Sequence, residues 1–267
     1  MCRGGGRGRS TSLVLVRRTD PSSKPAVLDL ESLAGATEVG LQRNQGEGTQ
    51  DLLVVGVRLV LPSSDNPSRV VELSPRYQVV NGWRETIQVC HDKLQSDSSS
   101  WLTIVSGQRM AFHSPLPTAD TCHSDPPTLR FRPVSGGQWS WSSPVSAASL
   151  GSFSLRVRSP QSTTFGVAEV VEEGQSLVLK ISAQEAARVP YRLENWSGDT
   201  AIAFCQKGVE EWEKLEGGGS AGFVWADTRL PRKILLSVLG TLPSPSSKGR
   251  VCSDGPHWGI GRGQVRS

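Results

Sequence analysis

Apolar and polar residues alternate in short runs along this chain, and each run ends at a cluster of turn-forming residues. The clearest runs are DLLVVGVRLVL at 51–61, TLRFRPV at 128–134 and SFSLRVR at 152–158. Alternation with a period of two is typical of half-buried β-strands, and clusters of Gly, Pro, Ser and Asp between runs are typical of turns. The pattern therefore predicts an all-β fold of the sandwich or barrel type, with a strand about every 8–12 residues.

The two ends of the chain lack this alternation. The stretch RGGGRGRS at 3–10 and the Pro-, Ser- and Gly-rich stretch from residue 243 onward are predicted to be disordered, since neither can build an apolar core. We predict four segments: a basic Gly/Arg-rich leader and linker at 1–50, a first β-repeat at 51–158, a second β-repeat at 159–240 and a disordered basic tail at 241–267.

The net charge of +4 arises from the ends of the chain. Residues 1–18 hold five arginines and no acidic residue, and residues 248–267 have a net charge of +3, so the remainder carries −4. A nucleic-acid groove needs positive charge gathered on a folded face. We therefore predict no nucleic-acid partner.

Cysteine and histidine positions give little support for a disulfide framework or a metal site. The five cysteines are Cys2, Cys90, Cys122, Cys205 and Cys252; they are odd in number and far apart, which favours reduced thiols in the cytosol. Cys90-His91 and Cys122-His123 are adjacent pairs, and neighbouring residues in a strand point to opposite faces, so each pair could offer one ligand at most. We predict no metal and no other cofactor.

A Tyr-x-x-x-Asn pattern occurs twice in similar surroundings. Tyr77 precedes Asn81, and Tyr191 precedes Asn195, 114 residues further along the chain. Asn interrupts strands, but its amide can satisfy two backbone groups at a turn. The recurrence predicts a repeated β-unit in which each Asn either organises its own repeat or contacts a ligand directly.

Four stretches carry a resemblance to a known family: RVVELSPRYQVVNGW, WSWSSPVSAASLGSFSLRVRS, PYRLENWSG, and FCQKGVEEWEKL with the following GFVWADTRLPRKILLSV. In this order they resemble the adaptor-binding domain of the vacuolar protein sorting-associated protein 13 family, which are bridge-like lipid-transfer proteins. The resemblance covers about residues 52–240 and implies tandem β-sandwich-like repeats, each with an Asn that matches Asn81 or Asn195.

The same resemblance implies a function. The domain would capture adaptor proteins that carry a Pro-x-Pro segment, and those adaptors would place a lipid-transfer protein on endosomes, vacuoles, Golgi membranes or contact sites. The chain would then be cytoplasmic, peripheral and bound to membranes only through its adaptors, with Asn81, Asn195, Tyr77 and Tyr191 as adaptor-binding or repeat-organising residues. Because about two repeats are present and the lipid-carrying rod is not, we expect a fragment, a truncated member or an incomplete gene model.

Two alternatives to an adaptor-binding module remain. Gly218 to Gly222 match the G-x-S-x-G pattern of a serine hydrolase with Ser220 as nucleophile, but an apolar strand should precede that motif and a helix should follow it. Here a strand-like FVWAD follows, which favours a glycine-rich hairpin turn. The other alternative is a non-functional fragment whose repeat faces stay uncovered. We therefore predict a protein that is not an enzyme.

Overall fold

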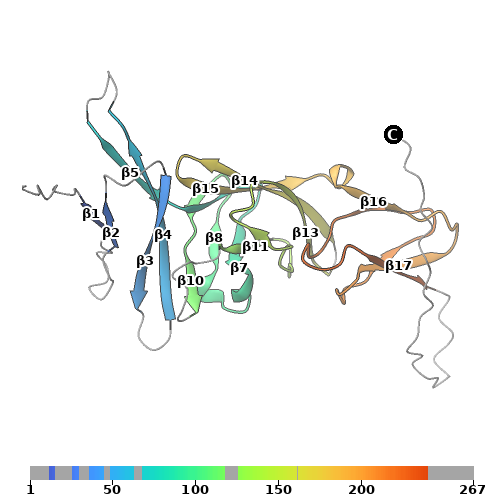
Figure 1. Cartoon of the computed structure of the whole chain (residues 1–267). Helices are drawn as coiled ribbons and strands as arrows, with labels where there is room; N and C mark the ends of the chain where they lie inside the picture. The colour runs from blue at the N-terminus through green and yellow to red at the C-terminus, as the bar shows by residue number, and fades with distance from the viewer. Residues whose placement is uncertain are drawn as a thin grey trace, which may run out of the picture.

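A computed structural model of the chain describes residues 12–15, 26–29, 36–44, 49–62, 68–117, 126–160 and 162–239. Strands make up 55% of it and helical residues 5%, which confirms the predicted all-β fold. Figure 1 shows the sheets arranged in a row from β1 to β17. The strands are β1 (Ser12–Leu15), β2 (Ala26–Asp29), β3 (Ala36–Asn44), β4 (Thr49–Val60), β5 (Val70–Pro75), β6 (Tyr77–Gly82), β7 (Ile87–His91), β8 (Leu102–Ile104), β9 (Arg109–Ala111), β10 (Ser114–Pro117), β11 (Thr128–Pro133), β12 (Val145–Ser146), β13 (Gly151–Arg158), β14 (Thr163–Glu173), β15 (Ser176–Gln184), β16 (Tyr191–Glu194), β17 (Ala201–Gln206), β18 (Glu213–Leu215), β19 (Ser220–Phe223) and β20 (Ile234–Leu239). Three 3-10 turns accompany them: η1 (Asp92–Leu94), η2 (Ser98–Ser100) and η3 (Ala186–Arg188).

The segment expected to be a leader and linker contains strands where the structure describes it. β1 pairs with β2, and β3 pairs with the long strand β4 over nine residue pairs. The opposite edge of β4 carries β10 near its start and β5 near its end. The polar residues of β3 concealed this strand in the sequence, because its pairing depends on the apolar partner β4 rather than on its own alternation.

Strands β6–β9 and β11–β15 form a two-layered sandwich, here called the first module. One sheet has the order β13-β14-β15-β6-β9 and the other β12-β11-β7-β8. The expected boundary between residues 158 and 159 falls inside the first of these sheets, between β13 and β14, which pair along their length. The third strand of this hairpin series, β15, then adds parallel to β6, more than 90 residues earlier in the chain.

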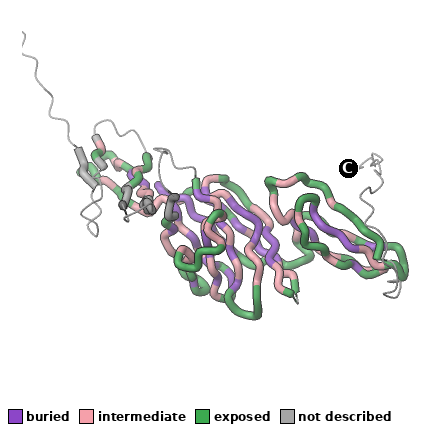
Figure 2. The backbone as a smooth tube through the Cα atoms, turned by 90° about the horizontal axis from the view of Figure 1, so that it is seen from below, coloured by how far each residue is buried: buried purple, intermediate pink, exposed green. Residues whose placement is uncertain are grey.

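The core of the first module lies between its two sheets. Phe131 and Ile87 face Leu155, Leu179 and other buried apolar side chains from the opposite layer. Figure 2 shows the buried residues as continuous inner stripes along these strands. The burial follows the alternation of the sequence, as in TLRFRP, where every second residue is buried.

Strands β16–β20 form a smaller unit, here called the second module. A two-stranded sheet of β16 and β19 faces a three-stranded sheet with the order β18-β17-β20. Its core contains Phe204, Leu215 and Phe223. The second module therefore has counterparts of β6, β7, β8, β9 and β11, but among the described residues none of β13–β15.

No helix within the described ranges is long and apolar enough to cross a membrane. The predicted disordered stretch 3–10, the tail 241–267 and the residues Cys2, Cys122, His123 and Cys252 lie outside the described residues.

Candidate functional site

Asn81 lies near the end of β6 and binds three backbone groups of its own module. Its side-chain nitrogen donates to the carbonyl oxygens of Glu85 at 2.8 Å and Ile104 at 2.9 Å. Its side-chain oxygen accepts the backbone N–H of Trp83 at 2.8 Å. The residue is 0% exposed. The amide thus joins the end of β6 to the turn that follows and to β8, on the opposite sheet.

Asn195 makes the matching set of contacts after β16. Its side-chain nitrogen donates to the carbonyl oxygens of Thr200 at 2.8 Å and Leu215 at 3.1 Å, and its side-chain oxygen accepts the N–H of Ser197 at 3.1 Å. Leu215 ends β18 as Ile104 ends β8. The repeat in the sequence is therefore also a repeat of hydrogen-bond geometry.

The backbones of the two asparagines also bind in the same way. The Asn81 N–H donates to Gln108, and its carbonyl accepts from Gly107 at 2.7 Å. The carbonyl of Asn195 likewise accepts from Gly218 at 2.7 Å. Gly107 and Gly218 have φ values of 75° and 71°, a conformation that favours glycine. Both side-chain polar atoms of each Asn therefore have hydrogen-bond partners inside its own module.

The two tyrosines of the pattern occupy different environments. Tyr77 is buried in the first core, and burial raises the pKa of its hydroxyl. Tyr191 is 45% exposed and packs edge-on against Phe223 and Trp225. The Tyr-x-x-x-Asn pattern therefore has equivalent asparagines, while its tyrosines differ in burial.

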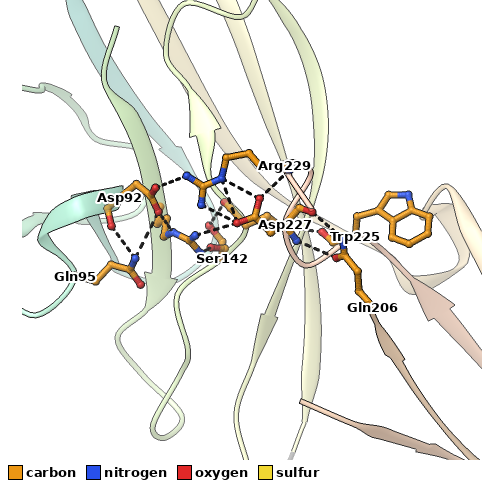
Figure 3. Close-up of polar contacts among 9 residues, drawn as sticks. Asp92, Gln95, Ser142, Gln206, Trp225, Asp227 and Arg229 are labelled. Carbon is orange, nitrogen blue, oxygen red and sulfur yellow. Dashed lines mark hydrogen bonds and ion pairs between the residues drawn. The ribbon is translucent and has the colours of Figure 1, made fainter. Parts of the chain in front are cut away.

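A polar cluster joins the two modules (Figure 3). Arg229, from the loop before β20, donates to Asp92 of the first module at 2.7 Å and to Asp227 of its own module at 2.7 Å. Arg130 on β11 binds the Asp92 carboxylate and the carbonyl oxygen of Ser142, and lies 3.7 Å from Asp227. Two carboxylates and two guanidinium groups thus alternate across the junction.

The electrostatics of this cluster favour ionised carboxylates. Burial raises the pKa of Asp92, but hydrogen bonds from Arg130 and Arg229 outweigh it and hold the pKa below its usual range. The hydrogen bond from Arg229 likewise lowers the pKa of Asp227. Gln206, buried at the end of β17, fixes the loop: its side chain donates to the Asp227 carbonyl at 2.8 Å and accepts the Asp227 N–H at 3.1 Å.

A cavity of about 260 Å³ lies beside this cluster, at the same junction. Its walls include Trp141, Leu230, Arg130, Arg156 and Arg158. The last two arginines are paired with Glu213 and Glu211 across the junction, and Arg130 is paired in the cluster. Each of the three guanidinium groups already has a carboxylate partner. These arginines therefore contribute to the contact between the two modules rather than to a site for a bound anion.

A proline-bearing strand covers part of one sheet edge. β10 is Ser114-Pro115-Leu116-Pro117, and it pairs antiparallel with residues 49–52 of β4, with Pro115 opposite Asp51 and Pro117 opposite Thr49. Proline withholds a backbone donor from a sheet, which excludes it from most central strands. β10 is an edge strand, where a proline can direct its nitrogen away from the neighbouring strand.

The other chemical candidates of the sequence lie in structural roles. Ser220 begins β19 directly after a turn at Gly218, and its hydroxyl binds Arg192 Nε at 2.8 Å. Arginine stays protonated and cannot serve as the general base that a serine nucleophile needs. Cys90 is buried on β7, where burial raises the pKa of its thiol to about 12, and His91 caps η1. Among the described residues no three His, Cys, Asp or Glu side chains gather as a metal site would require.

The junction residues were not identified as functional in the sequence. Asp92 and Arg130 fall in stretches with no motif, and their meeting with Arg229 depends on how the modules pack. Trp225 and Asp227 do belong to GFVWADTRLPRKILLSV, one of the stretches that carried the family resemblance. That stretch was the one signal in the sequence that pointed to the junction, because Asp227 belongs to the polar cluster there.

Comparison with known proteins gives one family. A family model described as vacuolar-sorting associated protein 13, adaptor binding domain, matches residues 9–220. A search of curated proteins found no match. The matched range includes both asparagines, the first module and the strands before it, and it confirms the resemblance drawn from the sequence. The chain belongs to the vacuolar-sorting associated protein 13 family and carries its adaptor-binding domain.

Proposed function

We propose that this chain is a non-catalytic module that captures adaptor proteins through an extended Pro-x-Pro segment, which adds as a strand to a sheet edge. Family membership supports adaptor binding. The geometry of β10 supports the mode, because it places a Pro-x-Pro segment of this chain itself against the edge of β4. In strand addition, main-chain hydrogen bonds supply affinity and the alternate side chains supply specificity.

The spacing of the two prolines suits such an edge. Along an antiparallel strand, residues alternate between hydrogen-bonded and non-hydrogen-bonded pairs. Two prolines separated by one residue can therefore both occupy positions whose nitrogen faces away from the ladder. The intervening residue, as Leu116 does in β10, then keeps its N–H for the partner strand. A Pro-x-Pro segment loses little pairing while it gains a backbone already biased toward the extended form.

The edge of β4 beside residues 49–52 is the site that we assign to the adaptor. There β10 acts as an internal occupant that the adaptor displaces. β10 pairs with only four residues of β4, and this short ladder limits the hydrogen bonds that hold it in place. An adaptor segment of the same class with further flanking contacts would compete successfully for this edge.

Asn81 and Asn195 serve this function indirectly in our proposal. Each fixes the turn after the first strand of its module, and Tyr77 adds to the first core beside Asn81. Tyr191 is half-exposed and contributes to the second module from its rim, by packing on Phe223. Adaptors on endosomes, vacuoles, the Golgi or contact sites would then hold the chain at the membrane surface in the service of lipid transport, and a fluorescent fusion of the chain should leave those membranes when its adaptor is deleted.

A binding titration tests the proposal. A fluorescein-labelled peptide with a Pro-x-Pro core is titrated with the full chain and followed by anisotropy, beside a matched peptide with Ala-x-Ala. Replacement of residues 114–117 by Gly-Ser-Gly-Ser should tighten binding of the Pro-x-Pro peptide, by about tenfold if β10 occupies the edge nine-tenths of the time. Pro160→Gly, at an exposed bend away from β4, is the control and should leave affinity unchanged. Equal affinity for the Pro-x-Pro and Ala-x-Ala peptides would refute the proposal. So would a Pro-x-Pro affinity that is unchanged when β10 is replaced.

A further inference from the structure

The strand β20 is apolar on both faces and lies at the edge of its sheet. Its sequence is ILLSVL, without a charged residue. Leu236 is 65% exposed and Val238 is 68% exposed. Edge strands of soluble proteins are normally protected by charges, prolines or a cover, and an apolar run broken only by one serine, Ser237, is typical of a strand buried on both faces. β20 therefore has the composition of an interior strand.

The first module shows what its equivalent, β11, is packed against. Asn81 and Asn195 bind Ile104 and Leu215, which lie opposite Ile87 and Ile202 in their ladders. Counting from these pairs makes Val89 of β7 equivalent to Phe204 of β17.

The ladders then identify the exposed residues. Phe131 lies opposite Val89, and Leu236 lies opposite Phe204. Pro133 and Val238 correspond in the same way. Phe131 is 1% exposed, whereas its counterpart Leu236 is 65% exposed. Leu236 and Val238, which are exposed on β20, thus occupy positions that are buried in the first module.

Strands β13–β15 are what buries Phe131 in the first module. Leu155, Ala168, Leu179 and Ile181 from these three strands lie around it. The same unit reaches the opposite sheet, where β15 pairs parallel with β6. In the second module β16 is the counterpart of β6, and among the described residues its only strand partner is β19, on one side. The free edge of β16 and the inner face of β20 are therefore open on the same side of the second module.

We propose that this open side, formed by the free edge of β16 with Leu236 and Val238 of β20, is a docking surface for a β-meander of the β13–β15 type. The incoming unit would carry apolar residues at alternate positions, and its last strand would run parallel to β16. The first module supplies this description, because it holds such a unit at the equivalent place. Residues 240–267 do not match it: half of them are Gly, Pro or Ser, and they contain no alternating apolar run. The occupant is then a β-unit from a further module, and this surface is separate from the edge of β4.

A peptide with the sequence of β15, SLVLKISAQ, is the probe. Labelled with fluorescein, it is titrated with the full chain and followed by anisotropy. A peptide in which the residues equivalent to Leu177, Leu179 and Ile181 are serine is the matched control. We expect saturable binding of the first peptide and none of the second, because these three residues face the core in the first module.

Variants of the chain locate the binding. Leu236→Ser with Val238→Ser should weaken the probe about tenfold or more, since each removes apolar area that the probe would bury. These residues are exposed, so the fold should survive the change. Leu150→Ser, at a position 59% exposed in the first module, is the control and should bind the probe as the wild type does.

Three results would overturn the proposal. The first is no binding of the probe to the wild type, and the second is binding that persists unchanged in the double Ser variant. The third is a dimer in sedimentation that dissociates in the double Ser variant, because a second copy would then cover the face in place of a meander.

Discussion

Replacement of Asn81 by Ala should destabilise the first module by about 3 kcal/mol. The change removes the partners of the Glu85 and Ile104 carbonyls and of the Trp83 N–H at a site that is 0% exposed. The contacts with Ile104 and Trp83 are buried and the contact with Glu85 is part-buried. A buried group left without a partner costs about 1–3 kcal/mol, so two such groups within that range, with a smaller cost at Glu85, give the estimate. Asn81→Asp should be at least as harmful, because a carboxylate cannot donate to the two carbonyls and would be a buried charge.

Asn195→Ala should cost less, about 2 kcal/mol. The Thr200 carbonyl also accepts a hydrogen bond from the Ser197 hydroxyl at 2.8 Å, so it keeps one partner when the amide is removed. Urea unfolding of the full chain, followed by tryptophan fluorescence, measures the loss of stability. Gln108→Ala, an exposed amide near Asn81, is the control and should stay within about 0.5 kcal/mol of the wild type.

Amide hydrogen exchange shows where each loss occurs. In Asn81→Ala the Trp83 amide should exchange faster while the Ser197 amide keeps its protection, and in Asn195→Ala the reverse should hold. Each variant is thus the control for the other. Losses below about 0.5 kcal/mol in both variants would refute the organising role, and so would a loss of Pro-x-Pro peptide binding with stability unchanged, since a direct contact would then be responsible.

Three further predictions concern the core, the junction and a thiol. Gly166→Ala would place a Cβ 2.6 Å from Trp83 and 3.1 Å from the Ser182 carbonyl, so it should lower the free energy of unfolding by about 1–3 kcal/mol; a variant as stable as the wild type would show that the close approach is not required. The pKa of Asp92 lies below its unfolded value of 3.8, so its contribution is complete above that value and is lost as the pH falls through the lower native pKa; Asp92→Asn should therefore flatten the fall of stability between about pH 5 and pH 2 in acid titration. Burial raises the pKa of the Cys90 thiol to about 12, so iodoacetamide should label Cys90 only after unfolding, and labelling at Cys90 in the native chain, located by mass spectrometry of peptides, would contradict the buried placement.

The sequence was sufficient for features that depend on local pattern. Alternation in TLRFRPV and SFSLRVR predicts strands that the structure contains as β11 and β13. The Tyr-x-x-x-Asn recurrence located Asn81 and Asn195 because the same turn chemistry is needed twice.

The sequence did not predict features that depend on pairing between segments far apart in the chain. From the sequence, the residues of β14 and β15 are predicted to belong to the second repeat, because they follow residue 159. The structure places both strands in the first module, because Leu177 of β15 pairs in parallel with Tyr77, 100 residues earlier. No local pattern specifies such a partner. The junction of Asp92 with Arg229 has the same origin, since it depends on the packing of two modules.

The central claim is that a Pro-x-Pro segment binds by taking the place of β10 on β4. Amide hydrogen exchange of the full chain, with and without saturating Pro-x-Pro peptide, tests it most directly. We predict that the Leu116 amide becomes unprotected when the peptide binds, while the amides of Gln50 and Leu52 on β4 keep their protection because the peptide replaces their partner strand. A bound peptide that leaves the exchange of Leu116 unchanged would contradict the claim.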